Sequence, residues 1–252
     1  MSTSIPCVLY QIVRVSIVKF QLNTLYNSNI QHIFLNNYHY LSFLDELPEF
    51  KRQVLEVMRQ PLEDRFVTIS RSQYSVEFPA SFMFVAAMNP CPCGNYNHPT
   101  IACTCKPGEV QNYLGKVSGP LMDRIDLHVE VVPVSHEELA SNKPTEKSAS
   151  IRKRVVMARE IQKQRFANQF NIFCNAQMTS RMVRQYCQID ETGQAILKQA
   201  MDRLGLSARA YDRILKVART IADLDGSENI ETGHLSEAIN FRSLDRDNWG
   251  KR

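Results

Sequence analysis

The sequence predicts an α/β core followed by an all-helical domain, and three observations lead to this prediction. Residues 82–88, FMFVAAM, form a continuous apolar run, as is typical of a strand buried on both faces of a parallel sheet. Residues 40–62 combine a short strand-like run with apolar residues at helical spacing. Residues 151–252 hold successive segments that open near a capping-type residue and carry an apolar stripe.

These patterns divide the chain into four segments. We expect an atypical N-terminal segment over 1–40, the α/β core over 41–134, a linker over 135–150 and the helical domain over 151–252. The linker, SHEELASNKPTEKSAS, is polar and contains a proline, which is typical of a domain boundary.

The first 40 residues differ in composition from the rest. They contain no Asp, Glu or Gly, whereas Asn is frequent. Residues 8–22 are rich in β-branched and aromatic side chains, and we expect residues 8–20 to form a strand. Two interpretations stay open: an edge strand with a polar loop, or a start that did not evolve with the remainder of the chain, such as a truncated or frameshifted one.

The core elements are predicted in chain order. Residues 40–44 favour a strand, and Pro48 suits the first turn of a helix. That helix is supported by apolar residues at helical spacing, namely Phe50, Val54, Val57, Met58 and Leu62. Residues 67–69 and 75–78 predict a β-hairpin insert, and the alternating residues 125–134 predict a strand that is covered on one face.

The helical domain is predicted as a series of amphipathic helices. Their expected spans are 151–166, 179–187, 190–204, 207–224 and 231–241. The first of these helices is strongly basic, and the others each open near a residue that can cap a helix.

Composition narrows the class of protein. The 252 residues are 44% hydrophobic and 22% charged, as is ordinary for a globular protein, and the net charge of +4 permits nucleic-acid binding without arguing for it. No apolar run approaches the roughly 18 residues of a membrane span, and we expect no secretory signal, because no compact apolar run precedes a small-residue cleavage site near residue 1. Seven cysteines, four of them between Cys91 and Cys105, suit a reducing compartment. We therefore expect a cytoplasmic protein without a membrane partner.

Polar side chains follow two of the predicted strands. Asp45 and Glu46 come directly after residues 40–44, and Asn89 follows residues 82–88. Ligands of open α/β sheets bind beyond the carboxyl ends of the strands, and this chemistry suits a magnesium–nucleotide site. The alternative for the acidic pair alone is a helix N-cap at Asp45 with a solvated neighbour.

The sequence resembles the magnesium-chelatase-like branch of the AAA+ ATPases, in particular the bacterial ComM/YifB type, from residue 43 to 246. The resemblance rests on FLDELPEFKRQVLEVMRQPLED, VTISR, FVAAMNPCPCG, SGPLMDRIDLHVEV and SARAYDRILKVARTIADL. It implies a partial AAA+ P-loop core followed by a helical lid domain. It also implies ATP and Mg²⁺ as cofactors, assembly as a hexameric ring, and DNA as a partner.

The resemblance implies a role for individual residues. Asp45 matches the Walker B residue that holds Mg²⁺, and Glu46 matches the catalytic base. Asn89 matches sensor 1, and Arg124 matches the arginine finger that reaches the γ-phosphate bound by a neighbouring subunit. Arg209 matches the sensor 2 arginine of the lid. Independently, a cap at Ser207 would put Arg209 in the first helical turn, where a cation opposes the helix dipole and a bound phosphate would compensate. The alternative for Arg209 is a surface arginine.

One expected element is missing from the sequence. The phosphate-binding loop of this family, G-x-x-x-x-G-K-[ST], precedes the FLDE strand, but no glycine precedes Gly94. By resemblance, its strand would lie between residues 82–88 and 125–131, and residues 8–20 are the only candidate to fill that place. We expect a truncated subunit without ATPase activity of its own. The alternatives are a non-enzymatic zinc-containing assembly module and a non-functional remnant of a disrupted gene.

The four clustered cysteines predict a second type of site. Cys91, Cys93, Cys103 and Cys105 form two C-x-C pairs, and four thiolates can hold a structural Zn²⁺. His98 could replace one sulfur, and the alternative is a loop with four reduced thiols. For DNA, the candidate contacts are Arg152, Lys153, Arg154, Arg159, Lys163 and Arg165, together with Arg65, Arg71 and Lys116. Solvated helix faces are the alternative for these basic residues.

Overall fold

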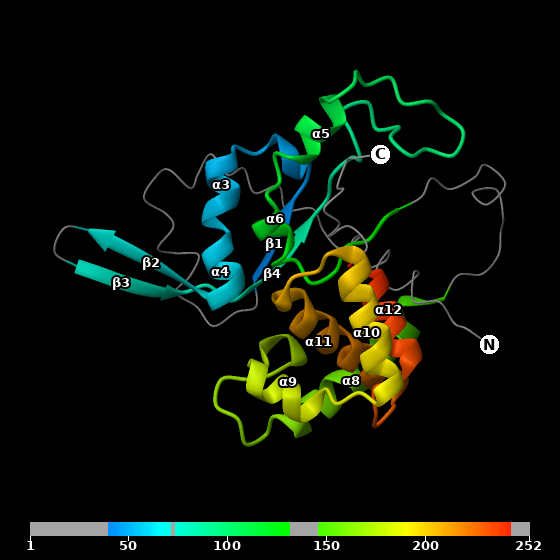
Figure 1. Ribbon diagram of the computed structural model, residues 1–252. Coiled ribbons are helices and arrows are strands. Elements are labelled where there is room, and N and C mark those ends of the chain that lie inside the picture. Colours follow the sequence, from blue (N-terminus) through cyan, green and yellow to red (C-terminus); the bar gives the residue numbers. More distant parts are fainter. Residues whose placement is uncertain (1–39, 72–73, 132–145, 243–252) are drawn as a thin grey trace. The chain divides into compact units, whose positions relative to one another are not determined.

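The computed structural model describes residues 40–71, 74–131 and 146–242 (Figure 1). The strand predicted over 8–20 lies outside these residues. The chain divides into two compact units. The described part of the first, 40–71 and 74–125, is called the sheet unit, and that of the second, 126–131 and 146–242, is called the helical unit. None of the described helices has the length and apolar character needed to cross a lipid bilayer.

The sheet unit contains the predicted parallel strand pair. Strand β1 (Tyr40–Leu44) pairs with β4 (Phe82–Ala86), in a register that runs from Tyr40 opposite Phe82 to Leu44 opposite Ala86. Parallel strands need a long crossover connection, and the segment between these two strands supplies it. The α/β prediction is confirmed by this small parallel sheet and its helices.

The crossover begins with three short helices. These are η2 (Leu47–Glu49), which holds Pro48 in its first turn as predicted, α3 (Arg52–Val57) and α4 (Arg59–Asp64). The sequence pattern predicts one continuous helix here, but it is broken between Glu49 and Arg52 and again at Met58. Pro61 has no N–H to donate to the carbonyl of Val57, so the helical hydrogen bonding is interrupted at this point. Val57, one of the apolar residues at helical spacing, is 67% exposed.

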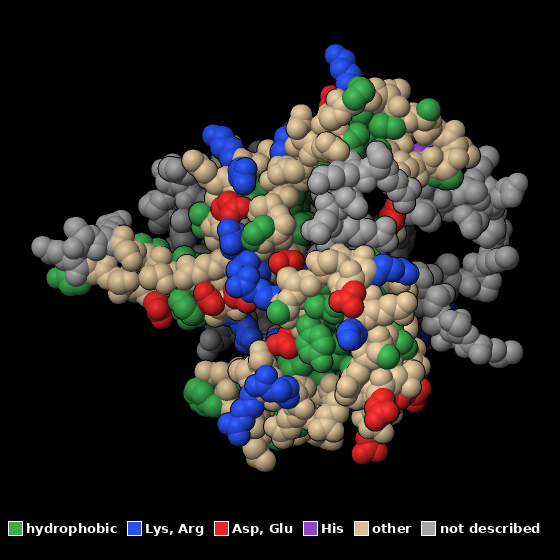
Figure 2. All heavy atoms as spheres, viewed as in Figure 1, with side chains coloured by type: hydrophobic (Ala, Val, Ile, Leu, Met, Phe, Trp, Pro, Cys, Tyr) green, Lys and Arg blue, Asp and Glu red, His purple; other side chains and the backbone are tan. Residues whose placement is uncertain are grey.

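The predicted hairpin is confirmed. Strand β2 (Phe66–Arg71) pairs antiparallel with β3 (Tyr74–Pro79), and the hairpin extends away from the rest of the sheet unit (Figures 1 and 2). Ile69 and Val76 face each other in this register and are both exposed.

A small apolar core fixes the ends of the two parallel strands. Leu44, at the end of β1, packs with Leu47 and Leu55 of the crossover. It also packs with Val117 and with Leu121, and these two residues belong to the segment that carries α5 (Glu109–Leu114) and α6 (Gly119–Met122). The described part of this core therefore lies directly beneath the position where the acidic pair leaves the sheet.

The helical unit confirms the five predicted helices. They are α8 (Ser148–Arg165), α9 (Ser180–Tyr186), α10 (Glu191–Leu204), α11 (Ala208–Asp225) and α12 (Thr232–Asn240), with a short η3 (Asn175–Gln177) between the first two. Thr179, Asp190 and Ser207 cap α9, α10 and α11 through their side-chain oxygens. The apolar stripe of α11 enters a continuous core, in which Ile214, Ala218 and Ala222 are fully buried.

The strand predicted over 125–134 is wrong for its described part, because residues 125–131 form no strand. Burial does not alternate here either: Leu127, Val129, Glu130 and Val131 are all exposed, and His128 alone among residues 127–131 is buried. The N–H of His128 donates to the carbonyl of Phe241 at 2.8 Å, next to the end of α12. Alternation predicts which side chains share a face, but a strand also needs a neighbouring strand to accept its hydrogen bonds.

Candidate functional site

The ends of the two parallel strands bring the predicted acidic pair and Asn89 to one edge. The N–H of Ala87 donates to the carbonyl of Leu44 at 2.8 Å, and the N–H of Leu47 donates to the carbonyl of Ala87 at 3.0 Å. These two bonds clamp the chain that leaves β1 against the chain that leaves β4. Asp45 and Glu46 lie between the clamped residues, and Asn89 follows two residues after Ala87. All three side chains are exposed there.

The backbone at the acidic pair has an uncommon conformation. Glu46 adopts φ 54° and ψ 50°, which lie in the left-handed region. This conformation is energetically unfavourable for any residue that has a side chain. The side chain of Asp45 accepts a hydrogen bond from the N–H of Glu46 at 3.0 Å, which supports this turn. The turn ends β1 abruptly and leaves both carboxylates pointing away from the apolar core.

Helix α5 supplies a residue that the sequence did not indicate. Tyr113 is buried, and its pKa is raised by burial and by the charge of Glu49, against the lowering effect of a hydrogen bond from the backbone of Asn89. The ammonium of Lys116 lies 5.6 Å from the centre of the Tyr113 ring and 3.3 Å from Glu49. Tyr113 thus joins the chain at Asn89 to α5, and the only signal for it is an aromatic residue on a short helix.

Arg124 follows α6 and is held within the sheet unit. Its side chain is only 10% exposed, its Nε lies 3.1 Å from a carboxylate oxygen of Glu63, and its Nη1 donates to the carbonyl of Pro120 at 2.6 Å. An arginine that acts on a neighbouring subunit must leave the Glu63 carboxylate before it can reach a phosphate.

Arg209 occupies the predicted position at the start of α11. The Ser207 hydroxyl accepts a hydrogen bond from the N–H of Ala210 at 3.2 Å, so the predicted cap is confirmed. Arg209 lies in the first turn and is exposed. A cation in this place opposes the partial positive charge of the helix N-terminus, and an anion would relieve that opposition.

The four predicted cysteines form a cluster of sulfur atoms. The sulfur of Cys91 lies 3.3 Å from that of Cys93 and 3.8 Å from that of Cys103, and the Cys93 and Cys103 sulfurs are 3.5 Å apart. With Cys105 included, all four lie within 4.8 Å of one another. His98 is otherwise engaged, because its Nδ1 accepts the backbone N–H groups of Thr100 and Ile101.

The thiols of the cluster differ in their surroundings. Backbone N–H groups of Asn95 and Thr104 lower the pKa of Cys93 to about 5, while burial raises the pKa of Cys105 to about 12. Outside the cluster, burial in the helical unit raises the pKa of Cys187 to about 12, so this thiol stays neutral. Among the described cysteines, only the clustered thiols have the arrangement of a ligand set.

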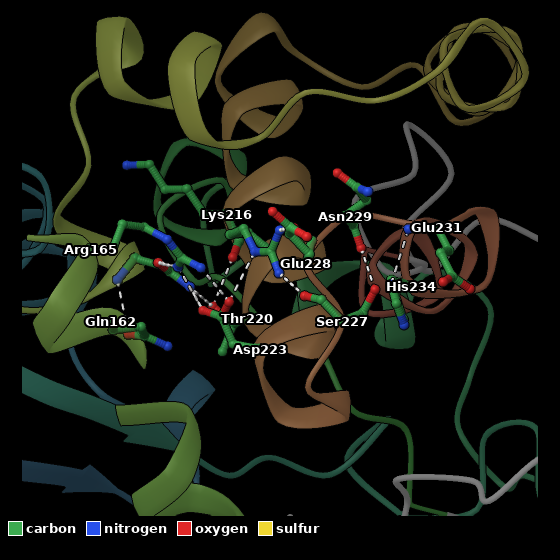
Figure 3. A network of polar contacts seen from close by, with 12 residues as sticks. Gln162, Arg165, Lys216, Thr220, Asp223, Ser227, Glu228, Asn229, Glu231 and His234 are labelled. Atoms are coloured by element: carbon green, nitrogen blue, oxygen red, sulfur yellow. Dashed lines mark hydrogen bonds and ion pairs between the residues drawn. The ribbon is translucent and has the colours of Figure 1, made fainter. Parts of the chain in front are cut away.

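A buried polar network occupies the centre of the helical unit (Figure 3). Arg165 of α8 makes a two-pronged contact with the Asp223 carboxylate, at 2.7 and 2.6 Å, and also donates to Asn175 at 2.8 Å. Arg219 donates to the same carboxylate at 3.0 Å, and its remaining nitrogens bind the carbonyls of Ser227 and Glu228. Asp223 is completely buried, so its charge acts within the fold rather than at a surface.

Comparison with known proteins shows which family the chain resembles. The family model of the magnesium chelatase subunit ChlI matches residues 33–139, and that of the ChlI C-terminal region matches residues 145–242. The competence protein ComM of Haemophilus influenzae is 42% identical over 205 residues, and the uncharacterized protein YifB of Escherichia coli is 42% identical over 206 residues. The chain belongs to the ComM/YifB-like magnesium-chelatase family.

The ComM/YifB-like match covers most of this chain but a smaller share of its relatives. In both comparisons the aligned region is 81% of this chain and 39% of the relative. YifB of Salmonella typhimurium, at 39% identity over 206 residues, gives the same coverage. The chain thus spans about two fifths of the length of the curated relatives it matches.

The acidic pair fits the Mg²⁺ that this family suggests, provided that other groups complete the coordination. Mg²⁺ usually binds proteins through one or two carboxylates and keeps water and substrate phosphates as its other ligands. Asp45 and Glu46 are two exposed carboxylates at a strand end, and within the described ranges they belong to no group of three or more candidate ligands. The residues present could therefore hold Mg²⁺ that arrives with a nucleotide.

The structure separates the basic residues that the sequence grouped as candidate DNA contacts. Arg165 is committed to Asp223 inside the fold, and Arg154 pairs with Glu146 through both guanidinium nitrogens. Lys116 pairs with Glu49 in the sheet unit. The other basic candidates on α8 are exposed, namely Arg152, Lys153, Arg159 and Lys163.

Proposed function

We propose that these 252 residues are part of a subunit of a ComM/YifB-type, ATP-driven DNA motor, and that ATP hydrolysis needs a phosphate-binding loop from outside them. In this proposal Asp45 holds the magnesium of the nucleotide, Glu46 is the general base, and Asn89 orients the attacking water. Arg209 contacts the phosphates from the lid, and Arg124 acts on the nucleotide of a neighbouring subunit in a homo-oligomeric ring.

The observation that carries this proposal is the clamp between the two strand ends. Two backbone hydrogen bonds hold Leu44 and Leu47 against Ala87, so the acidic pair and Asn89 leave the sheet at the same edge. Phosphoryl transfer depends mainly on positioning and on charge stabilisation. The two backbone bonds bring the three polar residues to one strand edge, which supports the first of these needs.

The second need, charge stabilisation, is met only in part. A P-loop provides backbone N–H groups and a lysine to the phosphates, and the 252 residues contain no G-x-x-x-x-G-K-[ST] motif. Without it, Asp45 and Glu46 bring negative charge toward a polyanion, and the magnesium ion alone would offset that charge. We therefore expect weak ATP binding and negligible turnover by the isolated chain.

The test is steady-state ATP hydrolysis by the purified 252-residue chain with Mg²⁺, with and without DNA. The control is the double variant Asp45→Ala, Glu46→Ala, which removes both carboxylates and leaves the clamp intact. Turnover on the order of 1 s⁻¹, within the usual range of enzymes, that disappears in the control would contradict the need for a supplied loop.

A mixing experiment tests the role of Arg124 in a neighbouring site. Adding the chain to a family member that carries a P-loop but an Arg→Ala replacement at its own finger should restore ATP hydrolysis, and an Arg124→Ala chain should not. Because Glu63 holds Arg124, a Glu63→Gln chain should restore activity at lower concentration. Equal rescue by the wild-type and Arg124→Ala chains would exclude this role.

The resemblance to the ComM/YifB type implies DNA as the substrate of the assembled motor, and one relative, from Haemophilus influenzae, is named a competence protein. The exposed basic residues of α8 give a direct test. Replacing Arg152 and Lys153 by Gln should weaken DNA binding and lower its dependence on salt, because each phosphate contact releases counterions. An Arg154→Gln variant is the matched control, since Arg154 already pairs with Glu146. An unchanged salt dependence in the double variant would exclude α8 as the contact.

A further inference from the structure

We propose that Cys91, Cys93, Cys103 and Cys105 bind a single Zn²⁺ as a closed structural site, and that this site fixes the chain at Asn89 and the start of α5. The metal site itself stands on the geometry of the sulfurs. The link from the metal site to Asn89 rests on the proposed function in one respect: only that proposal gives Asn89 a role in ATP hydrolysis.

The sulfur spacing matches one tetrahedral ion. Four thiolates at about 2.3 Å from a zinc ion lie about 3.8 Å from each other at tetrahedral angles. The three separations between Cys91, Cys93 and Cys103 are 3.3, 3.8 and 3.5 Å, and the whole set lies within 4.8 Å. A disulfide requires about 2.05 Å, so none of these pairs is bonded. Thiolates on the separate irons of a cluster would lie further apart, so a mononuclear site fits better.

The path of the chain also fits a metal site. Two C-x-C segments approach each other from opposite ends of one loop, and Gly94 at φ +81° and Asn97 at φ 62° turn the chain between them. The N–H of Gly94 donates to the carbonyl of Cys91 at 3.0 Å, and the N–H of Tyr96 donates to the Cys91 sulfur at 3.3 Å. Backbone N–H groups directed at sulfur are the outer-shell bonds that stabilise metal-bound thiolates.

The loop has little else to hold it. Between Cys91 and Cys105 there is no helix and no strand, and Cys91 is the only residue of this stretch that is buried. Ile101, its largest aliphatic side chain, is 52% exposed. Apolar burial is therefore too small to offset the entropy lost when the loop is ordered, and a bound metal would supply the missing free energy.

The ends of the loop reach the candidate nucleotide site. Cys91 follows Asn89 by two residues and is completely buried, while α5 begins at Glu109, four residues after Cys105. Tyr113 of α5 in turn lies near enough to the backbone of Asn89 for that backbone to lower its pKa. A metal bound by both C-x-C segments would connect the segment that follows Asn89 to the segment that precedes α5. The position of Asn89 would then depend on whether the zinc site is occupied.

The first experiment measures metal content. The full chain, purified under reducing conditions from cells grown with added zinc, should contain about one zinc per chain by elemental analysis. X-ray absorption should give only sulfur neighbours at about 2.3 Å. The Cys103→Ser, Cys105→Ser variant should lose the metal, while Cys174→Ser, outside the cluster, should retain it. Metal-free wild-type protein, or full metal content in the double variant, would overturn the proposal.

A second variant guards against simple misfolding. Cys105→His replaces one thiolate by an imidazole, which zinc also accepts, so it should keep most of the metal and show one nitrogen neighbour in the absorption spectrum. If Cys105→Ser keeps as much zinc as the wild type and Cys105→His shows no nitrogen neighbour, while the circular dichroism of both matches the wild type, Cys105 is not a ligand and the four-thiolate site is wrong.

The coupling to Asn89 is tested by hydrogen exchange of the full chain before and after chelation. Removing zinc should speed amide exchange at least tenfold over residues 88–114 and leave α10 to α12 unchanged. Faster exchange confined to residues 91–105 would keep the metal site but overturn the coupling. This readout does not depend on ATP hydrolysis, so it fails or succeeds independently of the proposed function.

Discussion

The two units treat their carboxylates in opposite ways. The helical unit buries Asp223 completely and surrounds it with Arg165, Arg219 and Asn175, whereas the sheet unit leaves Asp45 and Glu46 exposed at the end of β1. In the helical unit, the oxygens of the Asp223 carboxylate already accept hydrogen bonds from groups of the fold itself. The sheet unit leaves carboxylate oxygens available to a ligand, so the difference separates a charge that maintains structure from charges that can do chemistry.

The apolar cores follow the same division. In the helical unit, residues from α9, α10, α11 and α12 form one continuous buried cluster. In the described part of the sheet unit, five buried residues carry the core, and the partners around them are only partly buried. A unit with a small core depends more on additional constraints such as a metal or a partner strand.

The largest expected effect is on the helical unit. Asp223→Ala leaves Arg165 and Arg219 buried without their counter-charge, and breaking a buried ion pair in this way costs about 3–5 kcal/mol. Urea denaturation of the full chain, followed by far-ultraviolet circular dichroism, measures this change. Asp225→Ala is the control, because Asp225 is 75% exposed and its contact with His234 should contribute no more than about 1 kcal/mol. Equal losses in the two variants would show that the network is not the stabilising element.

A matched pair of leucines measures the contrast between the cores. Leu235 in the helical unit and Leu121 in the sheet unit are both completely buried. Large-to-small replacement costs about 2–5 kcal/mol, and less where neighbours can collapse into the space. On that scale we expect about 4 kcal/mol for Leu235→Ala and about 2 kcal/mol for Leu121→Ala, from hydrogen exchange of peptides in each unit. A larger cost for Leu121→Ala would mean that the sheet unit is as tightly packed as the helical unit.

The smallest expected effect concerns the start of α11. Ser207→Ala removes the cap that accepts the N–H of Ala210 and should cost about 1 kcal/mol of helical-unit stability. Thr192→Ala, at an exposed position of α10, should change stability by less than about 0.5 kcal/mol. Thermal unfolding of both variants measures the difference between their losses of stability. Equal losses would show that the Ser207 hydroxyl does not cap α11 in solution.

The helices could be predicted from the sequence because their signals are local. Thr179, Asp190 and Ser207 each stand directly before an apolar stripe, and all three cap the helix that was expected there. The parallel pair β1 and β4 could also be anticipated, because its residues are mostly apolar. In these elements, local propensity and the tertiary structure agree.

The sequence was least informative where distant residues decide the outcome. Arg165 was grouped with surface cations, but its partner Asp223 is 58 residues away and only the fold brings the two together. Residues 127–131 alternate like a strand, yet their chain direction is set by the bond between His128 and Phe241. The contact of Tyr113 with Asn89 likewise depends on how α5 packs, which no local pattern reports.

The left-handed backbone at Glu46 has a consequence for how this position can change over generations. An L-residue in that conformation costs on the order of 1 kcal/mol, and glycine adopts it without this cost. A mutation to glycine would therefore favour folding while it removed the carboxylate. A lineage in which this carboxylate no longer served a purpose would tend to drift toward glycine here, so the identity of residue 46 among close descendants reports whether its charge is still under selection.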